Sequence, residues 1–200
     1  MPRNEPNGSE MKEEIPMTYM PIKAAAHALA SYYPHAEETE KTILNCALFA
    51  AGADAVGGII PGLAIPATII SCFGTVWVMY GKLCSKLGIS LKENVLKLLA
   101  RAVLANIVAN LGSAIAALLA GMLIPGASAL ASAIVAFLAV YLAGLVFLKL
   151  IAKLVLKSSD LTSFSDISAH EMKKTVRETK VSKDDLNAAK EAYAANKAEC

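Results

Sequence analysis

One carboxylate, Asp54, lies within an apolar block that runs from Thr42 to Gly81 and contains no other charged residue. A charged side chain near the middle of a membrane span costs about 2.5–3.5 kcal/mol on insertion scales, and such residues usually mark functional sites. Asp54 could therefore serve transport or carry a proton. Two structural alternatives stay open: the carboxylate packs against polar neighbours, or it lies near a membrane face, because Pro61 interrupts the block soon after it.

Two asparagines, Asn106 and Asn110, are four residues apart, and Ser113 follows them. Residues spaced by four share one face of a helix. Together with Asp54, these side chains could line a polar seam or a narrow pore inside a helical bundle. Alternatively, the asparagines hydrogen-bond to neighbouring helices and only hold the bundle together, at about 0.6 kcal/mol each. The spacing alone leaves both interpretations open.

Two apolar blocks must supply the helices that carry these residues, and an Ile-Pro-Gly triplet divides each block. Ile60-Pro61-Gly62 divides the first block, and Ile124-Pro125-Gly126 divides a charge-free stretch from Ala102 to Leu148. Proline lacks the N–H that a helix interior needs and glycine accepts positive φ, so each pair predicts a turn. The sequence thus predicts an all-α integral membrane protein with four apolar helices in two hairpins, over about 43–81 and about 102–148, which turn at Pro61, Gly62, Pro125 and Gly126.

The length and composition of these helices predict a membrane location. Hydrophobic residues make up 56% of the chain and the mean hydropathy is +0.49, whereas soluble domains contain roughly 45–50% apolar residues. Each predicted helix has about the 20 apolar residues that are needed to cross a hydrocarbon core. Because the turns are uncharged, each hairpin either spans the bilayer or only dips into it as a wedge. The soluble alternative is a helical interaction module with an unusually apolar core.

Basic residues collect next to the apolar blocks, chiefly in a connector over residues 82–101 whose only acid is Glu93. Lys and Arg near span ends mark the cytoplasmic side. The connector, the C-terminal tail and, with an even number of spans, the N-terminus are therefore expected in the cytoplasm. These cations either set topology only or also bind anionic lipid headgroups, at about 1 kcal/mol per charge. The candidate headgroup ligands are Lys82, Lys86, Lys92, Lys97, Arg101, Lys149 and Lys153.

Polar ends frame this membrane domain, which is expected over residues 21–157. Residues 1–20 are rich in proline and glutamate, which predicts a disordered tail. Residues 158–200 predict a soluble linker followed by helices, and a capping box of Ser182 and Asp185 starts the last of these helices. This C-terminal region is expected to be a solvated tail; the alternative is a docking element for a cytoplasmic protein partner.

The sequence lacks the motifs that would predict an enzyme. It contains no Walker phosphate loop and no G-x-S-x-G nucleophile elbow, and its three histidines and four cysteines show no metal-ligand spacing. The net charge of +2 predicts no nucleic-acid partner. We therefore expect no catalysis, no cofactor and no metal site.

Small residues recur at four-residue spacing in the second hairpin, as at Gly112, Ala116 and Ala120. Such faces let helices approach closely in a membrane, which predicts dense packing and a homo-oligomer. The expected function is structural: a self-assembling scaffold whose hairpins shape or organise the bilayer. The rival is a channel or pore-forming protein with Asp54, Asn106 and Asn110 in its path, and the third alternative is the soluble module.

Four features follow one another along about residues 43–150: Ile60-Pro61-Gly62, Met79 before the basic helix end Lys82–Ile89, the second triplet Ile124–Gly126, and Gly144 in the last helix. In this order they resemble a family of bacterial membrane domains that has no agreed biochemical activity. These domains occur alone or C-terminal to Era-like GTPase domains. The sequence contains no GTPase part, so the resemblance implies nothing about nucleotide switching. It implies a membrane protein, which would lie in the bacterial inner membrane.

Overall fold

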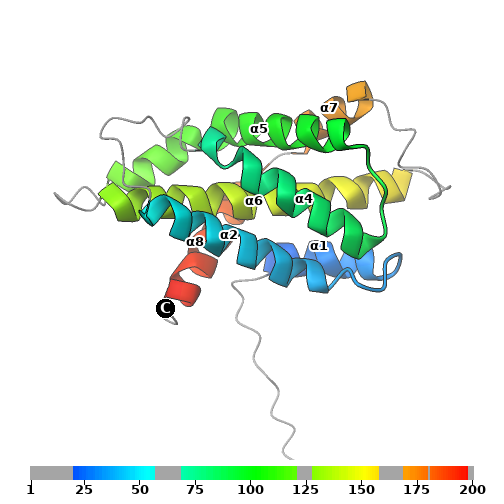
Figure 1. Ribbon diagram of the computed structural model, residues 1–200, viewed down its shortest axis with the longest axis horizontal. Coiled ribbons are helices and arrows are strands. Elements are labelled where there is room, and N and C mark those ends of the chain that lie inside the picture. The colour runs from blue at the N-terminus through cyan, green and yellow to red at the C-terminus, as the bar shows by residue number, and fades with distance from the viewer. Residues whose placement is uncertain (1–19, 57–68, 121–127, 158–168, 180, 198–200) are drawn as a thin grey trace, which may run out of the picture.

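The computed structural model describes residues 20–56, 69–120, 128–157, 169–179 and 181–197. Within these ranges the chain folds into α-helices without strands, which confirms the all-α prediction (Figure 1). The helices are α1 (Met20–Ala30), α2 (Glu38–Val56), α4 (Phe73–Leu87), α5 (Glu93–Ala120), α6 (Ser128–Lys157), α7 (Ala169–Glu178) and α8 (Lys183–Lys197).

Gly88 ends α4 and turns the chain toward α5. Its φ of 64° lies in the left-handed region, which glycine adopts without strain from a Cβ. The amide of Gly88 donates to the carbonyl of Ser85 at 3.3 Å, and the amide of Ile89 donates to the carbonyl of Cys84 at 2.9 Å. These bonds satisfy carbonyls that the helix end leaves without partners. The turn therefore sets where α4 stops and where the basic connector begins.

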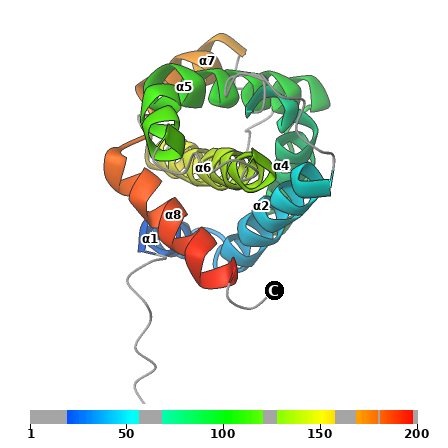
Figure 2. The ribbon, with the colours of Figure 1, turned by 90° about the vertical axis from the view of Figure 1, so that its left-hand side faces the viewer.

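Helix α6 lies at the centre of the bundle, and α1, α2, α4, α5, α7 and α8 all contact it (Figure 2). Residues 133–148 of its apolar span are all buried, whereas Leu130 and Leu156 at the two ends of that span are exposed. A helix that is apolar on all sides must be covered on all sides. The other helices provide this cover, so α6 and the residues that face it form the hydrophobic core.

The packing of α6 against α2 and α4 is close. Gly144 of α6 faces Ile43 of α2, and a Cβ built on the glycine would lie 2.6 Å from Cγ2 of Ile43. The hydroxyl of Tyr80 in α4 donates to the carbonyl of Ala143, the residue directly before Gly144, at 3.0 Å. The Tyr80 ring also stacks on Phe147, with 4.6 Å between the ring centroids. These contacts fix α2 and α4 side by side on α6.

Two helices in the described part of the chain are long and apolar enough to cross a membrane: the span Glu93–Ile115 in α5 and the span Leu130–Leu156 in α6. The sequence predicts four. Helix α4 has 15 residues, which at about 1.5 Å per residue is shorter than a hydrocarbon core of about 30 Å. Helix α2 has 19 residues but begins with charged ones. The two-hairpin arrangement therefore stays a prediction, and its turn residues Pro61, Gly62, Pro125 and Gly126 lie outside the described residues.

The C-terminal helices pack on the apolar helices. Helix α7 contacts α5 and α6, and α8 contacts α6 and α1. The sequence predicts that residues 158–200 form a linker and a solvated tail. Residues 158–168 lie outside the described ranges, but α7 and α8 belong to the same bundle as the predicted membrane domain (Figure 2).

Candidate functional site

Asn106 of α5 connects two helices. Its side-chain Nδ2 donates to the carbonyl of Val176 at 3.2 Å and to the carbonyl of Thr179 at 3.3 Å. Both carbonyls lie at the C-terminal end of α7, where a helix leaves its last carbonyls without internal partners. Asn106 therefore caps α7 from the side, which agrees with the packing interpretation of this asparagine.

Asn110 supports Asn106 from the next turn of the same helix. Its Nδ2 donates to the backbone carbonyl of Asn106 at 2.9 Å and also to the side-chain Oδ1 of Asn106. The second bond leaves the Nδ2 group of Asn106 directed toward α7. Asn110 and Ser113 are exposed. The predicted shared face of α5 is thus confirmed for the two asparagines.

Asp54 lies in α2, but its side chain is outside the part of the structure that is described. Among the described residues α2 and α5 make no contact, and α6 separates them (Figure 2). The structure therefore brings Asn106 and Asn110 together with α7 and does not bring the helix of Asp54 to them. The predicted polar seam of these residues has no support from the described contacts.

The cations of the connector contact protein groups as well as solvent. The Nζ of Lys86 lies 2.5 Å from Oε2 of Glu38 in α2, and this ion pair lowers the pKa of the exposed Glu38 carboxyl. Lys97 lies 2.6 Å from Glu93 and 4.7 Å from the ring centroid of Trp77. Together these pairs connect α2, α4 and α5.

Three further connector cations differ in how they lie. Arg101 stands over the ring of Phe73 at 5.2 Å, whereas Lys82 and Lys92 are simply exposed. The connector cations therefore form two groups: Lys86, Lys97 and Arg101 contact protein groups, and Lys82 and Lys92 expose their charge to solvent.

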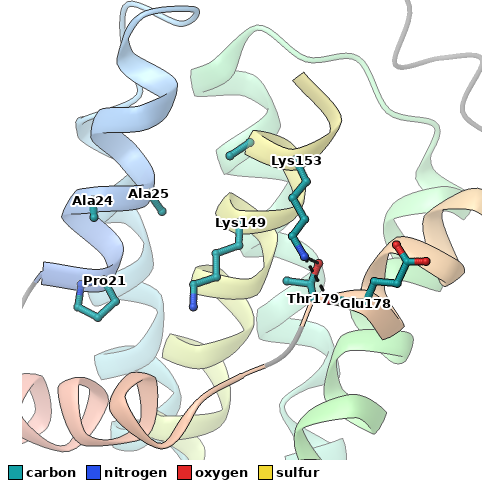
Figure 3. Close-up of a pocket in the computed structure, with 8 residues that line it drawn as sticks. Pro21, Ala24, Ala25, Lys149, Lys153, Glu178 and Thr179 are labelled. Atoms are coloured by element: carbon teal, nitrogen blue, oxygen red, sulfur yellow. Dashed lines mark hydrogen bonds between the residues drawn. The ribbon is translucent and has the colours of Figure 1, made fainter. Parts of the chain in front are cut away.

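Lys149 and Lys153 of α6 hold the C-terminal helices. The Nζ of Lys149 donates to both carboxylate oxygens of Asp185 at 2.8 Å, and the Asp185 side chain is only 5% exposed. The Nζ of Lys153 donates to the carbonyl of Glu178 at 3.2 Å and to Oγ1 of Thr179 at 3.3 Å (Figure 3). In this structure both lysines bind protein groups.

A groove of about 600 Å³ lies beside these two lysines. One wall is α1, and the other walls are α6 and the end of α7 (Figure 3). The sequence does not predict this groove, because three segments far apart along the chain form it. It is lined by Pro21, Ala24, Ala25, Lys149, Ala152, Lys153, Glu178 and Thr179.

Asp185 makes two contacts, of which the sequence predicts only one. The capping box is confirmed: the amide of Ser182 donates to Oδ2 of Asp185 at 2.8 Å, and the amide of Asp185 donates to Oγ of Ser182 at 3.1 Å. Its second role, as the partner of Lys149, was missed. The sequence does contain a signal for it: Lys149 directly follows the charge-free stretch that ends at Leu148, and a lysine covered by protein needs a counter-charge.

Cys84 provides a test of how tightly α4 packs. Its thiol is free and buried, and burial raises its pKa from 9.0 to about 12. Because the thiolate is the reactive form, we expect iodoacetamide at pH 8 to alkylate Cys84 at least about tenfold more slowly in the folded protein than in urea. Mass spectrometry of the peptide that contains Cys84 measures both rates. Equal rates would contradict the buried position of this thiol.

Within the described residues, no group of three or more His, Cys, Asp or Glu side chains could hold a metal ion. Comparisons with protein-family models, with curated proteins and with solved structures found no match to the chain. The likeness to the membrane-domain family therefore stays an expectation. The function has to be argued from the helices and their contacts.

Proposed function

We propose that the protein is a membrane protein with a structural role, which assembles with copies of itself and shapes or organises the bilayer. The observation that carries this proposal is the pair of neighbouring helices α5 and α6, each long and apolar enough to cross a membrane. The proposal places the protein in the bacterial inner membrane with both termini in the cytoplasm. Lipids, other copies of the chain and a cytoplasmic protein at residues 158–200 are its proposed partners.

The arrangement around α6 adds a condition to this proposal. Helices α7 and α8 cover part of α6 and expose charged residues such as Lys173, Arg177 and Lys183. Charged side chains are costly in hydrocarbon. Full insertion of α6 therefore requires α7 and α8 to move away from it, whereas shallow insertion of the outer helices does not.

The burial of α6 also favours a second candidate, a soluble helical interaction module. A core helix of a soluble protein is apolar and covered on all sides, and residues 133–148 of α6 are all buried. In that case the charged outer faces of α7 and α8 remain in water and the bundle persists unchanged. The two candidates differ in one measurable property, which is whether the protein stays with membranes.

The proposed function is tested by membrane fractionation followed by reconstitution. We expect the full-length protein to remain in the membrane pellet after an alkaline carbonate wash. We also expect it to convert liposomes into tubules or uniformly small vesicles in electron micrographs without releasing trapped ions. Recovery in the supernatant would establish the soluble module instead. Ion flux that disappears in Asp54→Asn, with normal assembly, would establish a channel.

A further inference from the structure

Helices α2 and α4 form an outer face of the molecule that carries exposed apolar side chains. The two helices contact each other and lie side by side on one side of α6 (Figures 1 and 2). Phe49 of α2 is 69% exposed and Val78 of α4 is 51% exposed, and Ile70, which lies just before α4, is 59% exposed. The α2–α4 face is defined here by the exposed residues Asn45, Phe49, Gly52, Ala53, Ile70, Gly74 and Val78.

No charged residue interrupts this face. Residues 42–53 of α2 and residues 69–81 through α4 contain no Asp, Glu, Lys or Arg. A Cβ added at Gly52 or at Gly74 would meet no atom within 4 Å, so neither glycine is covered by the bundle. An exposed apolar surface that no charged residue interrupts is a candidate interaction site, whereas apolar side chains scattered singly are common on any protein surface.

Basic residues lie at one end of the α2–α4 face. The ion pair between Lys86 and Glu38 places the C-terminal end of α4 beside the start of α2, so the two helices are antiparallel. Lys41 and Lys82, both exposed, therefore lie at the same end. Glu38 at that end is already bonded to Lys86. Glu37 and Glu40 also lie at this end, within one helical turn of Lys41, whereas Lys82 forms no ion pair with a described acid. The end therefore carries both signs of charge, with Lys82 as its exposed cation, and the other end of the face is uncharged in the described residues.

We propose that the α2–α4 face is the surface by which the protein binds a lipid bilayer that contains anionic phospholipids. The apolar side chains enter the boundary between headgroups and acyl chains, as an interfacial amphipathic helix does, and Lys41 and Lys82 contact the phosphate groups. The proposal rests on the proposed membrane function. It specifies which side of the molecule faces the lipid, and it leaves the charged faces of α7 and α8 in water.

A second copy of the chain fits this face less well than a bilayer. Two copies that met through it would have to supply acids for Lys41 and Lys82. The residues that define the face include no acid, and Glu37, Glu38 and Glu40 lie at the same end as the lysines. Two copies that met antiparallel would therefore place Lys82 against the uncharged end of the partner's face. A bilayer supplies both the anionic phosphates and the apolar phase, so charge complementarity selects the lipid.

The single tryptophan provides a direct readout. Trp77 is the only tryptophan of the chain and precedes Val78 in α4. Full-length protein is mixed with vesicles of phosphatidylcholine alone or with phosphatidylglycerol, some carrying brominated acyl chains, which quench tryptophan fluorescence on contact. We expect both types of vesicle to quench the tryptophan fluorescence. We expect the protein to bind the anionic vesicles at least about fivefold more tightly, because each lysine near the surface strengthens binding by about tenfold or less.

Variants locate the bound face. We expect Phe49→Asp with Val78→Asp to weaken vesicle binding at least tenfold, and Lys82→Glu to weaken it only for anionic vesicles. The matched controls are Ala28→Asp, at an exposed position of α1 outside both candidate spans, and Lys183→Glu on exposed α8. Both controls should bind as the unsubstituted protein does. Circular dichroism checks that each variant is folded. If the double aspartate variant does not fold, Lys82→Glu alone tests whether this face binds the bilayer.

Each outcome decides between the two proposals. If the unsubstituted protein binds neither type of vesicle, the proposed membrane function is overturned, and this inference with it. If it binds but the α2–α4 variants bind equally well, or the controls lose as much affinity, only the face is overturned. If the variants keep their affinity but change the size of the protein in light scattering, the face is a contact between copies, which also overturns the lipid assignment.

Discussion

Replacing Gly144 by alanine is expected to lower the free energy of unfolding by about 1–3 kcal/mol, although alanine favours helix by about 1 kcal/mol over glycine. The reason is the contact with α2: a Cβ at this position would lie 2.6, 2.7 and 2.9 Å from Cγ2, Cγ1 and Cδ1 of Ile43. Ile43 is fully buried. Its branched side chain cannot swing aside, so α2 must move away from α6. Thermal unfolding followed by circular dichroism measures the loss.

Gly112→Ala and Gly52→Ala are the matched controls. Both glycines lie in helices, and a Cβ at either would meet no atom within 4 Å. Both substitutions should therefore raise the free energy of unfolding by about 0.5–1 kcal/mol. A larger residue sharpens the test, because Gly144→Leu should separate α2 from α6 altogether. If Gly144→Ala stabilises the protein as much as Gly112→Ala does, the close contact between Gly144 of α6 and Ile43 of α2 does not exist.

The local features of the fold could be predicted from the sequence because they depend on neighbouring residues. Apolar runs without strand alternation predict helices, and the predicted fourth apolar helix matches α6 (Ser128–Lys157). The capping box of Ser182 and Asp185 involves residues three apart and is confirmed. The i, i+4 spacing of Asn106 and Asn110 likewise predicts that they share a face.

The long-range contacts could not be predicted in the same way. The partners of Asn106 are backbone carbonyls at the end of α7, 70 and 73 residues away. A backbone carbonyl has no residue type that would reveal it in a sequence. The ion pair of Lys149 and Asp185 joins residues 36 apart, and many lysines and acids of the chain could have paired instead.

Hydropathy also leaves the destination of α6 open. An apolar helix gains free energy when it leaves water, whether it enters lipid or a protein core. The α6 span satisfies the length and composition of a membrane helix and is at the same time covered by its own chain. The sequence therefore predicts that α6 avoids water. The structure shows in addition that α7 and α8 cover part of α6.

Replacing Asp185 by alanine is expected to lower the free energy of unfolding by about 2–4 kcal/mol and to release α8 from α6. The substitution removes the carboxylate that accepts from Lys149 at 2.8 Å, and it leaves the lysine partly buried without a counter-charge. It also removes the capping interaction with Ser182, which contributes about 1 kcal/mol. Faster amide hydrogen exchange across residues 183–197 measures the release of the helix.

Asp184→Ala is the matched control, because Asp184 precedes Asp185 in the same first turn and is exposed. It should change stability by less than about 0.5 kcal/mol. The pair Lys149→Met with Asp185→Leu should be more stable than Asp185→Ala, since it leaves no unpaired charge. If α8 covers apolar surface of α6 that can enter lipid, Asp185→Ala should also bind vesicles more tightly than Asp184→Ala. Equal exchange rates and equal binding in the two variants would mean that the ion pair of Lys149 and Asp185 does not hold α8 on α6.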